Sequence, residues 1–117
     1  ETLATLITQI HQELGKTVMA DVDTIEAAQL AAATGADCIA TTLYGYTEET
    51  KTEFPPGFQL LKQMVDNLAI PAICEGGIVS PIMAKKAMNL GAYAVVVGTD
   101  ITGIDSKVKA YKNEIIS

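Results

Sequence analysis

The sequence feature that most constrains the fold is a repeated unit of a short apolar strand, a carboxylate and an amphipathic helix. Residues 19–37 match residues 73–93, with an offset of 54 residues at the start (19 to 73) and 56 at the end (35 to 91). In both copies a carboxylate ends the strand, and a Gly-Ala pair joins the helix to the next strand. Apolar strands that alternate with helices are typical of a parallel sheet covered by helices.

The same reasoning predicts one helix followed by four β-α units. Gly15 is expected to end the first helix, Thr24 to cap the second, and Pro81 to occupy the first position of the fourth. A long polar loop is expected over residues 43–57. The expected helices span 3–14, 25–33, 58–68, 81–90 and 104–116, and the expected strands span 17–22, 37–42, 72–74 and 95–97.

Repeated β-α units with polar residues at the strand ends predict a (β/α)8 TIM barrel. The alternative is a doubly wound fold, which favours a glycine-rich turn after the first strand, where this chain has Asp21-Val22-Asp23. Barrel chains run to roughly 250 residues, whereas this chain has 117. We therefore predict that residues 1–117 are the C-terminal (β/α)4 half of one barrel domain, completed by a missing N-terminal half or by a second copy.

The charge balance excludes a nucleic-acid binder. The chain has 14 acidic residues against 8 basic ones, all of them Lys, and a formal charge of −6, so no basic face can be assembled. No apolar run approaches the roughly 20 residues of a membrane span. No signal peptide is visible, and Cys38 and Cys74 lie in apolar runs without a metal-ligand pattern. We expect reduced, buried thiols and a cytoplasmic protein.

Glu75 is the strongest candidate for catalysis. It ends an apolar strand just before Gly76-Gly77, at the end of a barrel where active sites lie, and a carboxylate there can act as acid or base. Asp21 occupies the equivalent place two strands earlier, so both side chains should point inward at a similar height. A buried carboxylate satisfied by backbone N–H groups, or one that holds a turn, remains the alternative for each.

Two further features lie at the same predicted end of the sheet. Gly76 and Gly77, with Gly98 and Thr99 after the last strand, offer backbone N–H groups that can bind a phosphate without Arg. The alternative is that these glycines only permit tight turns. The loop after the second strand, which contains Thr42 and Tyr46, could close over a sugar-like substrate, or its aromatic side chains could simply pack.

Four segments together resemble N-acetylmannosamine-6-phosphate 2-epimerases. They are Met19–Val22, Thr41–Thr47, Glu75–Ile78 and Gly91–Gly98, in family-like order and spacing. The second segment, Thr-Thr-Leu-Tyr-Gly-Tyr-Thr, is the most specific, and the others occur more widely in phosphate-binding barrels. The match covers essentially the whole chain, as the C-terminal half of such an enzyme.

This resemblance implies a cytoplasmic isomerase of sialic-acid catabolism that interconverts N-acetylmannosamine 6-phosphate and N-acetylglucosamine 6-phosphate by proton transfer at C2. It assigns a catalytic role to Glu75 and a substrate contact to Asp21, and it implies no cofactor. The family's catalytic Lys belongs to the upstream half, and an Arg after the last strand of the family is Gly103 here. We therefore expect this half alone to be inactive, the whole protein to act on a phosphorylated amino sugar, and a homodimer.

Two alternatives remain open from the sequence. One is another barrel enzyme that acts on a phosphorylated sugar. The other is a non-catalytic half-barrel that self-associates and at most binds phosphate.

Overall fold

The computed structural model describes residues 2–117 and contains one four-stranded parallel sheet with its helices. The strands are β1 (Met19–Asp21), β2 (Cys38–Ala40), β3 (Ala72–Glu75) and β4 (Ala94–Val96). The helices are α1 (Leu3–Gln9), its π-helical continuation η1 (Ile10–Leu14), α2 (Ile25–Ala33), α3 (Phe58–Asn67), α4 (Pro81–Asn89), α5 (Thr99–Thr102) and α6 (Ile104–Ile116). The expected α-β order is confirmed.

The strands lie in the sheet in the order of the chain, β1-β2-β3-β4, and every neighbouring pair is parallel. A doubly wound sheet reverses its strand order at a switch point, and no reversal occurs between these four strands. The register pairs Asp21 with Ala40 and Glu75 with Val96. The carboxyl ends of all four strands therefore meet at one edge of the sheet.

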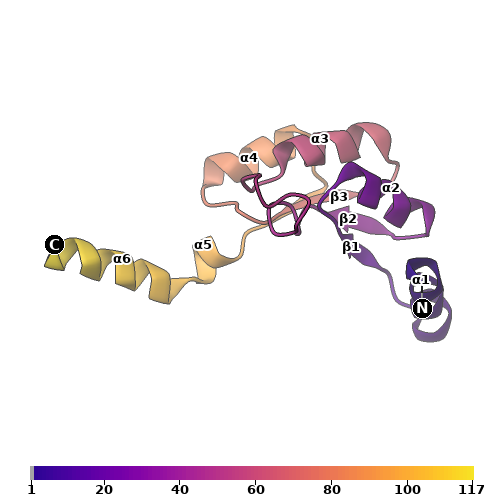
Figure 1. Cartoon of the computed structure of the whole chain (residues 1–117), viewed down its shortest axis with the longest axis horizontal. Helices are drawn as coiled ribbons and strands as arrows, with labels where there is room; N and C mark the ends of the chain where they lie inside the picture. The colour runs from indigo at the N-terminus through magenta and orange to yellow at the C-terminus, as the bar shows by residue number, and fades with distance from the viewer. Residues whose placement is uncertain (1) are drawn as a thin grey trace.

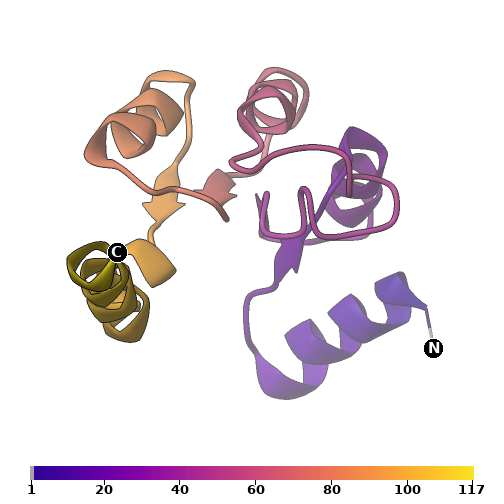
Figure 2. The ribbon, with the colours of Figure 1, turned by 60° about the vertical axis from the view of Figure 1, so that its left-hand side comes forward.

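Helices cover only one face of the sheet. Figure 1 shows α2, α3 and α4 on the same side of the strands, and in Figure 2 they form an arc around them. The core fills the space between this arc and the sheet, where Ile39, Leu61, Met64 and Cys74 are all fully buried. Because successive side chains of a strand alternate between faces, burial of Cys74 directs Glu75 to the face that these helices leave open.

Local sequence signals account for most helix boundaries. The side chain of Thr24 accepts a hydrogen bond from the N–H of Ala27, and that of Ser80 accepts one from Met83, both at 3.2 Å. Gly15 ends the first helical segment with φ of +59°, a conformation that glycine adopts without strain. These observations confirm the predicted caps.

Three local features differ from the prediction. The strand bounds differ: β1 and β2 are shorter than expected, β3 extends one residue further, to Glu75, and β4 lies one residue earlier. Strand β1 begins only at Met19, and the preceding Val18 N–H donates to the side chain of Asp37 at 2.7 Å. The first helix finishes in a π-helical turn. The one-turn helix α5, in which the N–H groups of Ile101 and Thr102 both donate to the Gly98 carbonyl, was not predicted.

The two ends of the structure lie far apart, and apolar surface is exposed there. Helix α6 projects from the body (Figure 1), and the longest dimension is 56 Å. None of the α6 side chains is buried, although Ile104, Val108, Tyr111 and Ile115 follow helical spacing along it. Strands β1 and β4 each have one unpaired edge within residues 2–117. No helix in this range is long and apolar enough to cross a membrane.

Candidate active site

Asp21 and Glu75 are brought together through the hydroxyl of Thr42. Asp21 ends β1, Glu75 ends β3, and Thr42 lies just beyond β2, between them. The Thr42 Oγ1 lies 2.9 Å from Asp21 Oδ1 and 3.0 Å from Glu75 Oε2, and both contacts are within hydrogen-bond distance. The two predicted carboxylates therefore do face the same space at a similar height.

The backbone of Glu75 is held by Thr41, a residue that sequence reasoning did not select as a site residue. Thr41 is 1% exposed. Its hydroxyl oxygen lies 2.9 Å from the Glu75 carbonyl, to which it donates, and 3.1 Å from the Glu75 N–H, from which it accepts. The Thr41-Thr42 pair follows an apolar strand, but nothing local in the sequence distinguishes the hydroxyl that holds the Glu75 backbone from the one that faces the site.

An open cavity of about 380 Å³ lies over this edge of the sheet. Every predicted site residue except Asp21 lines this cavity, and Asp21 is hydrogen-bonded to Thr42, which does line it. Tyr46 is 67% exposed and therefore stands at the rim. The lining residues are Thr42, Tyr46, Glu75, Gly76, Gly77, Ile78, Val79, Val96, Gly98, Thr99 and Asp100.

The glycine turn after β3 combines an unusual backbone with a close contact. Gly76 and Gly77 have φ of +93° and +71°, a region that other residues rarely adopt. A Cβ built on Gly77 would lie 2.5 Å from the Pro55 Cβ and 2.8 Å from the Pro55 carbonyl carbon. Gly77 is therefore required both for its dihedral angles and for the approach of the 43–57 loop.

Backbone donors are available around the cavity. Within residues 2–117, the N–H groups of Gly76, Gly77, Gly98 and Thr99 form no hydrogen bond. An anion placed there can accept from them. The Asp100 carboxylate also lines this cavity, but the Lys107 ammonium lies 3.4 Å from its Oδ1 and offsets its charge.

The 43–57 loop is tied down by its own polar contacts. The Gly45 N–H donates to Thr50 Oγ1 at 2.9 Å, and the Tyr44 hydroxyl donates to Glu53 at 3.1 Å. Burial, reinforced by the neighbouring Glu53 carboxylate, raises the pKa of the Tyr44 hydroxyl above its usual value. Of the two loop aromatics, Tyr44 packs inside the loop against the core, whereas Tyr46 lies at the cavity.

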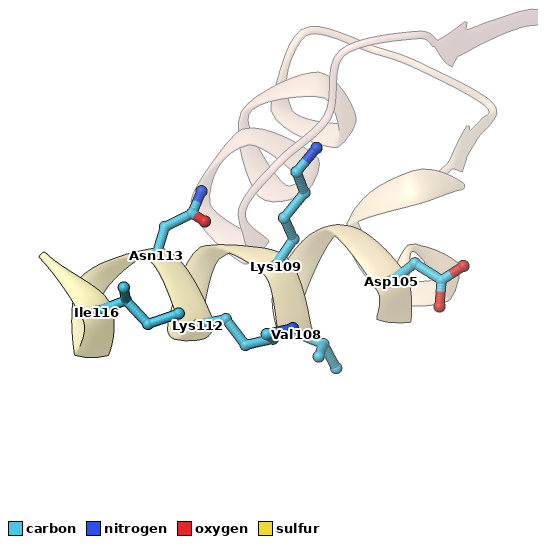
Figure 3. Close-up of a pocket in the computed structure, with 6 residues that line it drawn as sticks. All are labelled: Asp105, Val108, Lys109, Lys112, Asn113 and Ile116. Atoms are coloured by element: carbon cyan, nitrogen blue, oxygen red, sulfur yellow. The ribbon is translucent and has the colours of Figure 1, made fainter.

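Other candidate sites are weaker. A hollow along α6 is lined by Asp105, Val108 and further residues of that helix alone (Figure 3), so it is one side of a projecting helix. Cys74 is buried but Cys38 is only half-buried, which corrects the expectation for Cys38; both are free thiols. No group of three or more metal-ligating side chains occurs within residues 2–117.

A parallel β-α sheet with chain-ordered strands, one open face and carboxylates at the strand ends defines half of a (β/α)8 barrel, and it includes the edge at which the active sites of such barrels lie. The family model described as "Putative N-acetylmannosamine-6-phosphate epimerase" matches residues 1–117. The chain therefore belongs to this family, as its sequence motifs indicated.

Relatives show how much of the family's fold the chain represents. It is 60% identical over 111 residues to a protein of Thermosynechococcus vestitus, and 44% identical over 102 residues to one of Clostridium perfringens. Both are named "Putative N-acetylmannosamine-6-phosphate 2-epimerase"; the matches cover 95% and 87% of this chain but 49% and 46% of the relatives. A solved N-acetylmannosamine-6-phosphate 2-epimerase of Clostridium perfringens superposes with a TM-score of 0.88 at 41% identity, over 97% of this chain and 49% of that one. The chain spans about half the length of these relatives, which confirms the half-barrel.

Proposed function

We propose that the protein containing this chain interconverts N-acetylmannosamine 6-phosphate and N-acetylglucosamine 6-phosphate by moving the proton at C2. The observation that carries the proposal is the position of the Glu75 carboxyl in the cavity, hydrogen-bonded to Thr42 beside Asp21 and next to the glycine turn. The relatives named as 2-epimerases support the choice of substrate.

The chemistry follows from the substrate. In the open-chain sugar, the C1 aldehyde makes the C2 proton acidic, so a carboxylate can remove it and a carboxylic acid can return it. We assign this role to Glu75. Charge that develops on the C1 oxygen needs a donor, and the family resemblance assigns a Lys of the upstream half to share the work. The reaction as proposed requires no cofactor.

The remaining site residues are proposed to hold the substrate. The backbone N–H groups of Gly76, Gly77, Gly98 and Thr99 would bind the phosphate, because they are free of other acceptors within residues 2–117. Thr42, Tyr46 and Asp21 would contact the sugar. This assignment explains how a chain of net charge −6 can bind an anion: the donors are local and uncharged.

Gly103 marks a difference from the family's motif. A Cβ built there would overlap the Thr99 carbonyl oxygen, so the Arg expected from the resemblance would require the junction between α5 and α6 to open. We propose that the phosphate contact in this protein depends on the backbone donors more than on a cation after β4. A cytoplasmic role in sialic-acid catabolism and a homodimeric assembly complete the proposal.

The test is exchange of the C2 proton in the intact protein. With N-acetylmannosamine 6-phosphate in deuterated water, proton NMR should show deuterium entering C2 as N-acetylglucosamine 6-phosphate forms. Glu75→Gln should abolish both while leaving the circular dichroism spectrum unchanged. Glu26→Gln, on an exposed position of α2, is the matched control and should react normally. Wild-type exchange in Glu75→Gln would remove Glu75 from the mechanism.

A further inference from the structure

The polar contacts of the 43–57 loop form a continuous chain of hydrogen bonds that ends outside the loop. The Gly45 N–H donates to Thr50 Oγ1 at 2.9 Å, and Thr50 Oγ1 lies 2.9 Å from Thr47 Oγ1. The Thr47 hydroxyl donates to Asp23 Oδ2, in the turn between β1 and α2. A threonine hydroxyl has only one proton, so Thr47, which already donates to Asp23, accepts from Thr50. All the donors of this chain therefore point toward the Asp23 carboxyl.

The contact between Thr47 and Asp23 attaches the loop to the rest of the protein. Within residues 2–117, it is the only side-chain hydrogen bond that joins the 43–57 loop to another part of the chain. Thr50, in the middle of the hydrogen-bond chain, is 6% exposed. A buried hydroxyl that loses its partners costs free energy, so a loop movement that separates Thr50 from Thr47 is unfavourable.

Tyr46 lies between two residues that this hydrogen-bond chain holds. Gly45 and Thr47 are its neighbours in the sequence, and its own N–H donates to the Leu43 carbonyl at 2.9 Å. The Tyr46 side chain lines the cavity of the candidate site, and a Cβ built on Gly76 would lie 3.8 Å from Tyr46 Cε2. The ring therefore stands next to the glycine turn to which phosphate donors were assigned.

We propose that Asp23 is a positioning residue for substrate binding, because through Thr47 and Thr50 it holds Tyr46 at the cavity. This inference rests on the proposed function, in which Tyr46 contacts the sugar. Among residues 2–117, those that line the cavity include Tyr46 but not Asp23, Thr47 or Thr50. The effect of these three residues on the substrate therefore passes through Tyr46.

The hydrogen-bond chain should set the affinity for the substrate and leave the proton transfer unchanged. The backbone of Glu75, the proposed acid and base, is fixed by contacts with Thr41 and β4, which do not involve the 43–57 loop. If the loop is released, only the fraction of molecules with Tyr46 in place binds fully, and the apparent affinity falls by that fraction. Loss of one hydrogen bond changes such an equilibrium by roughly two- to tenfold.

The test compares variants of Thr47 and Asp23 in the intact protein, with N-acetylmannosamine 6-phosphate as the substrate. Thr47→Val keeps the shape but breaks both hydrogen bonds of the hydroxyl, Thr47→Ser keeps the hydroxyl, and Asp23→Ala removes the final acceptor. We expect Thr47→Val and Asp23→Ala each to raise KM at least about threefold with kcat unchanged, and Thr47→Ser to restore most of the affinity.

Thr34→Val is the control for the loss of a threonine hydroxyl. The Thr34 hydroxyl contacts only the last turn of α2, so this variant should match the wild type. An unchanged KM in Thr47→Val or in Asp23→Ala overturns the proposal, and so does an equal rise of KM in Thr47→Ser. A fall in kcat without a rise in KM also overturns it.

A double-mutant cycle separates an effect through Tyr46 from general damage to the loop. Tyr46→Ala alone should raise KM, because it removes the side chain at the cavity. In the Tyr46→Ala background, Thr47→Val should change KM little, so that the two effects are not additive. Additive effects would show that Thr47 acts on the substrate by another route and would overturn the proposal, as would an unchanged KM in Tyr46→Ala.

A further measurement does not depend on turnover. In proton NMR of the intact protein, a nuclear Overhauser effect between the Tyr46 ring and the Gly76 α protons should be present in the wild type and in Thr47→Ser. It should be weaker in Thr47→Val, and an equal intensity in that variant overturns the proposal. If the wild type does not exchange the C2 proton at all, the proposed reaction fails, and this NMR result alone decides whether the hydrogen-bond chain holds Tyr46 in place.

Discussion

Gly77→Ala is predicted to destabilise the folded protein more than Gly15→Ala. Both glycines have a positive φ, but only Gly77 also lies against other atoms of the protein. Gly77 has φ of +71°, and an alanine Cβ there would lie 2.5 Å from the Pro55 Cβ, 2.8 Å from its carbonyl carbon and 3.0 Å from its carbonyl oxygen. A residue other than glycine costs about 1–2 kcal/mol in this conformation. Two of the three Pro55 atoms belong to the backbone, so relief requires the loop to move.

The overlap is expected to add about 1–3 kcal/mol, the usual cost of overpacking. The total loss is then about 2–5 kcal/mol from the sum of these two costs. Gly15→Ala provides the matched control, because Gly15 has φ of +59° but a Cβ built there would meet nothing within 4 Å. Gly15→Ala should lower the free energy of unfolding only by the cost of a positive φ for alanine, about 1–2 kcal/mol. Both changes restrict the unfolded chain equally, so that effect cancels in the comparison.

The assay is urea unfolding of the intact protein without substrate, followed by circular dichroism. The free energy of unfolding is obtained from the midpoint and the slope for each variant. The free energy of unfolding of Gly77→Ala should be lower than that of Gly15→Ala, by the cost of the overlap with Pro55. Equal losses for the two variants would show that the Pro55 contact yields freely, and that the loop is not held against the glycine turn as the structure indicates.

Two further predictions concern pH and thiol chemistry. The Val18 N–H, and next the His11 side chain, lower the pKa of the Asp37 carboxyl, so its stabilisation is present above the usual Asp value of about 3.9 and is lost as pH falls through the lowered value. Asp37→Asn should therefore be less stable than wild type at neutral pH, and the difference in their free energies of unfolding should shrink as the pH is lowered. Urea unfolding at several pH values measures this difference; a difference that is constant with pH would contradict the prediction. Burial raises the pKa of both thiols, and the Asp37 carboxylate adds to the effect at Cys38, so access of the reagent decides the order. Cys74 is fully buried and Cys38 is half-buried, so in the folded protein Cys74 should react with a thiol reagent only after Cys38. Mass spectrometry of the labelled protein checks the order, and prior labelling of Cys74 would contradict it.

The positions of the predicted site residues could be inferred because strand ends are local features. An apolar run that stops at Asp21 or Glu75, followed by a helix cap at Thr24 or Ser80, places each carboxylate at a known end of its strand. The role of Thr41 could not be inferred. A threonine at a strand end is equally compatible with solvent exposure, and its contact with the Glu75 backbone joins residues 34 positions apart.

The sequence by itself determined the alternation of strands and helices, the carboxylates at one edge of a parallel sheet, and the number of β-α units, because these follow from local periodicity and caps. The tertiary structure alone decided that Thr42 bridges Asp21 and Glu75 and that Pro55 packs on Gly77. It also decided that α6 stands away from the other helices. Such contacts depend on strand register and on the path of a long loop. Both are set by the packing of segments distant in the chain, which local residue preferences do not encode.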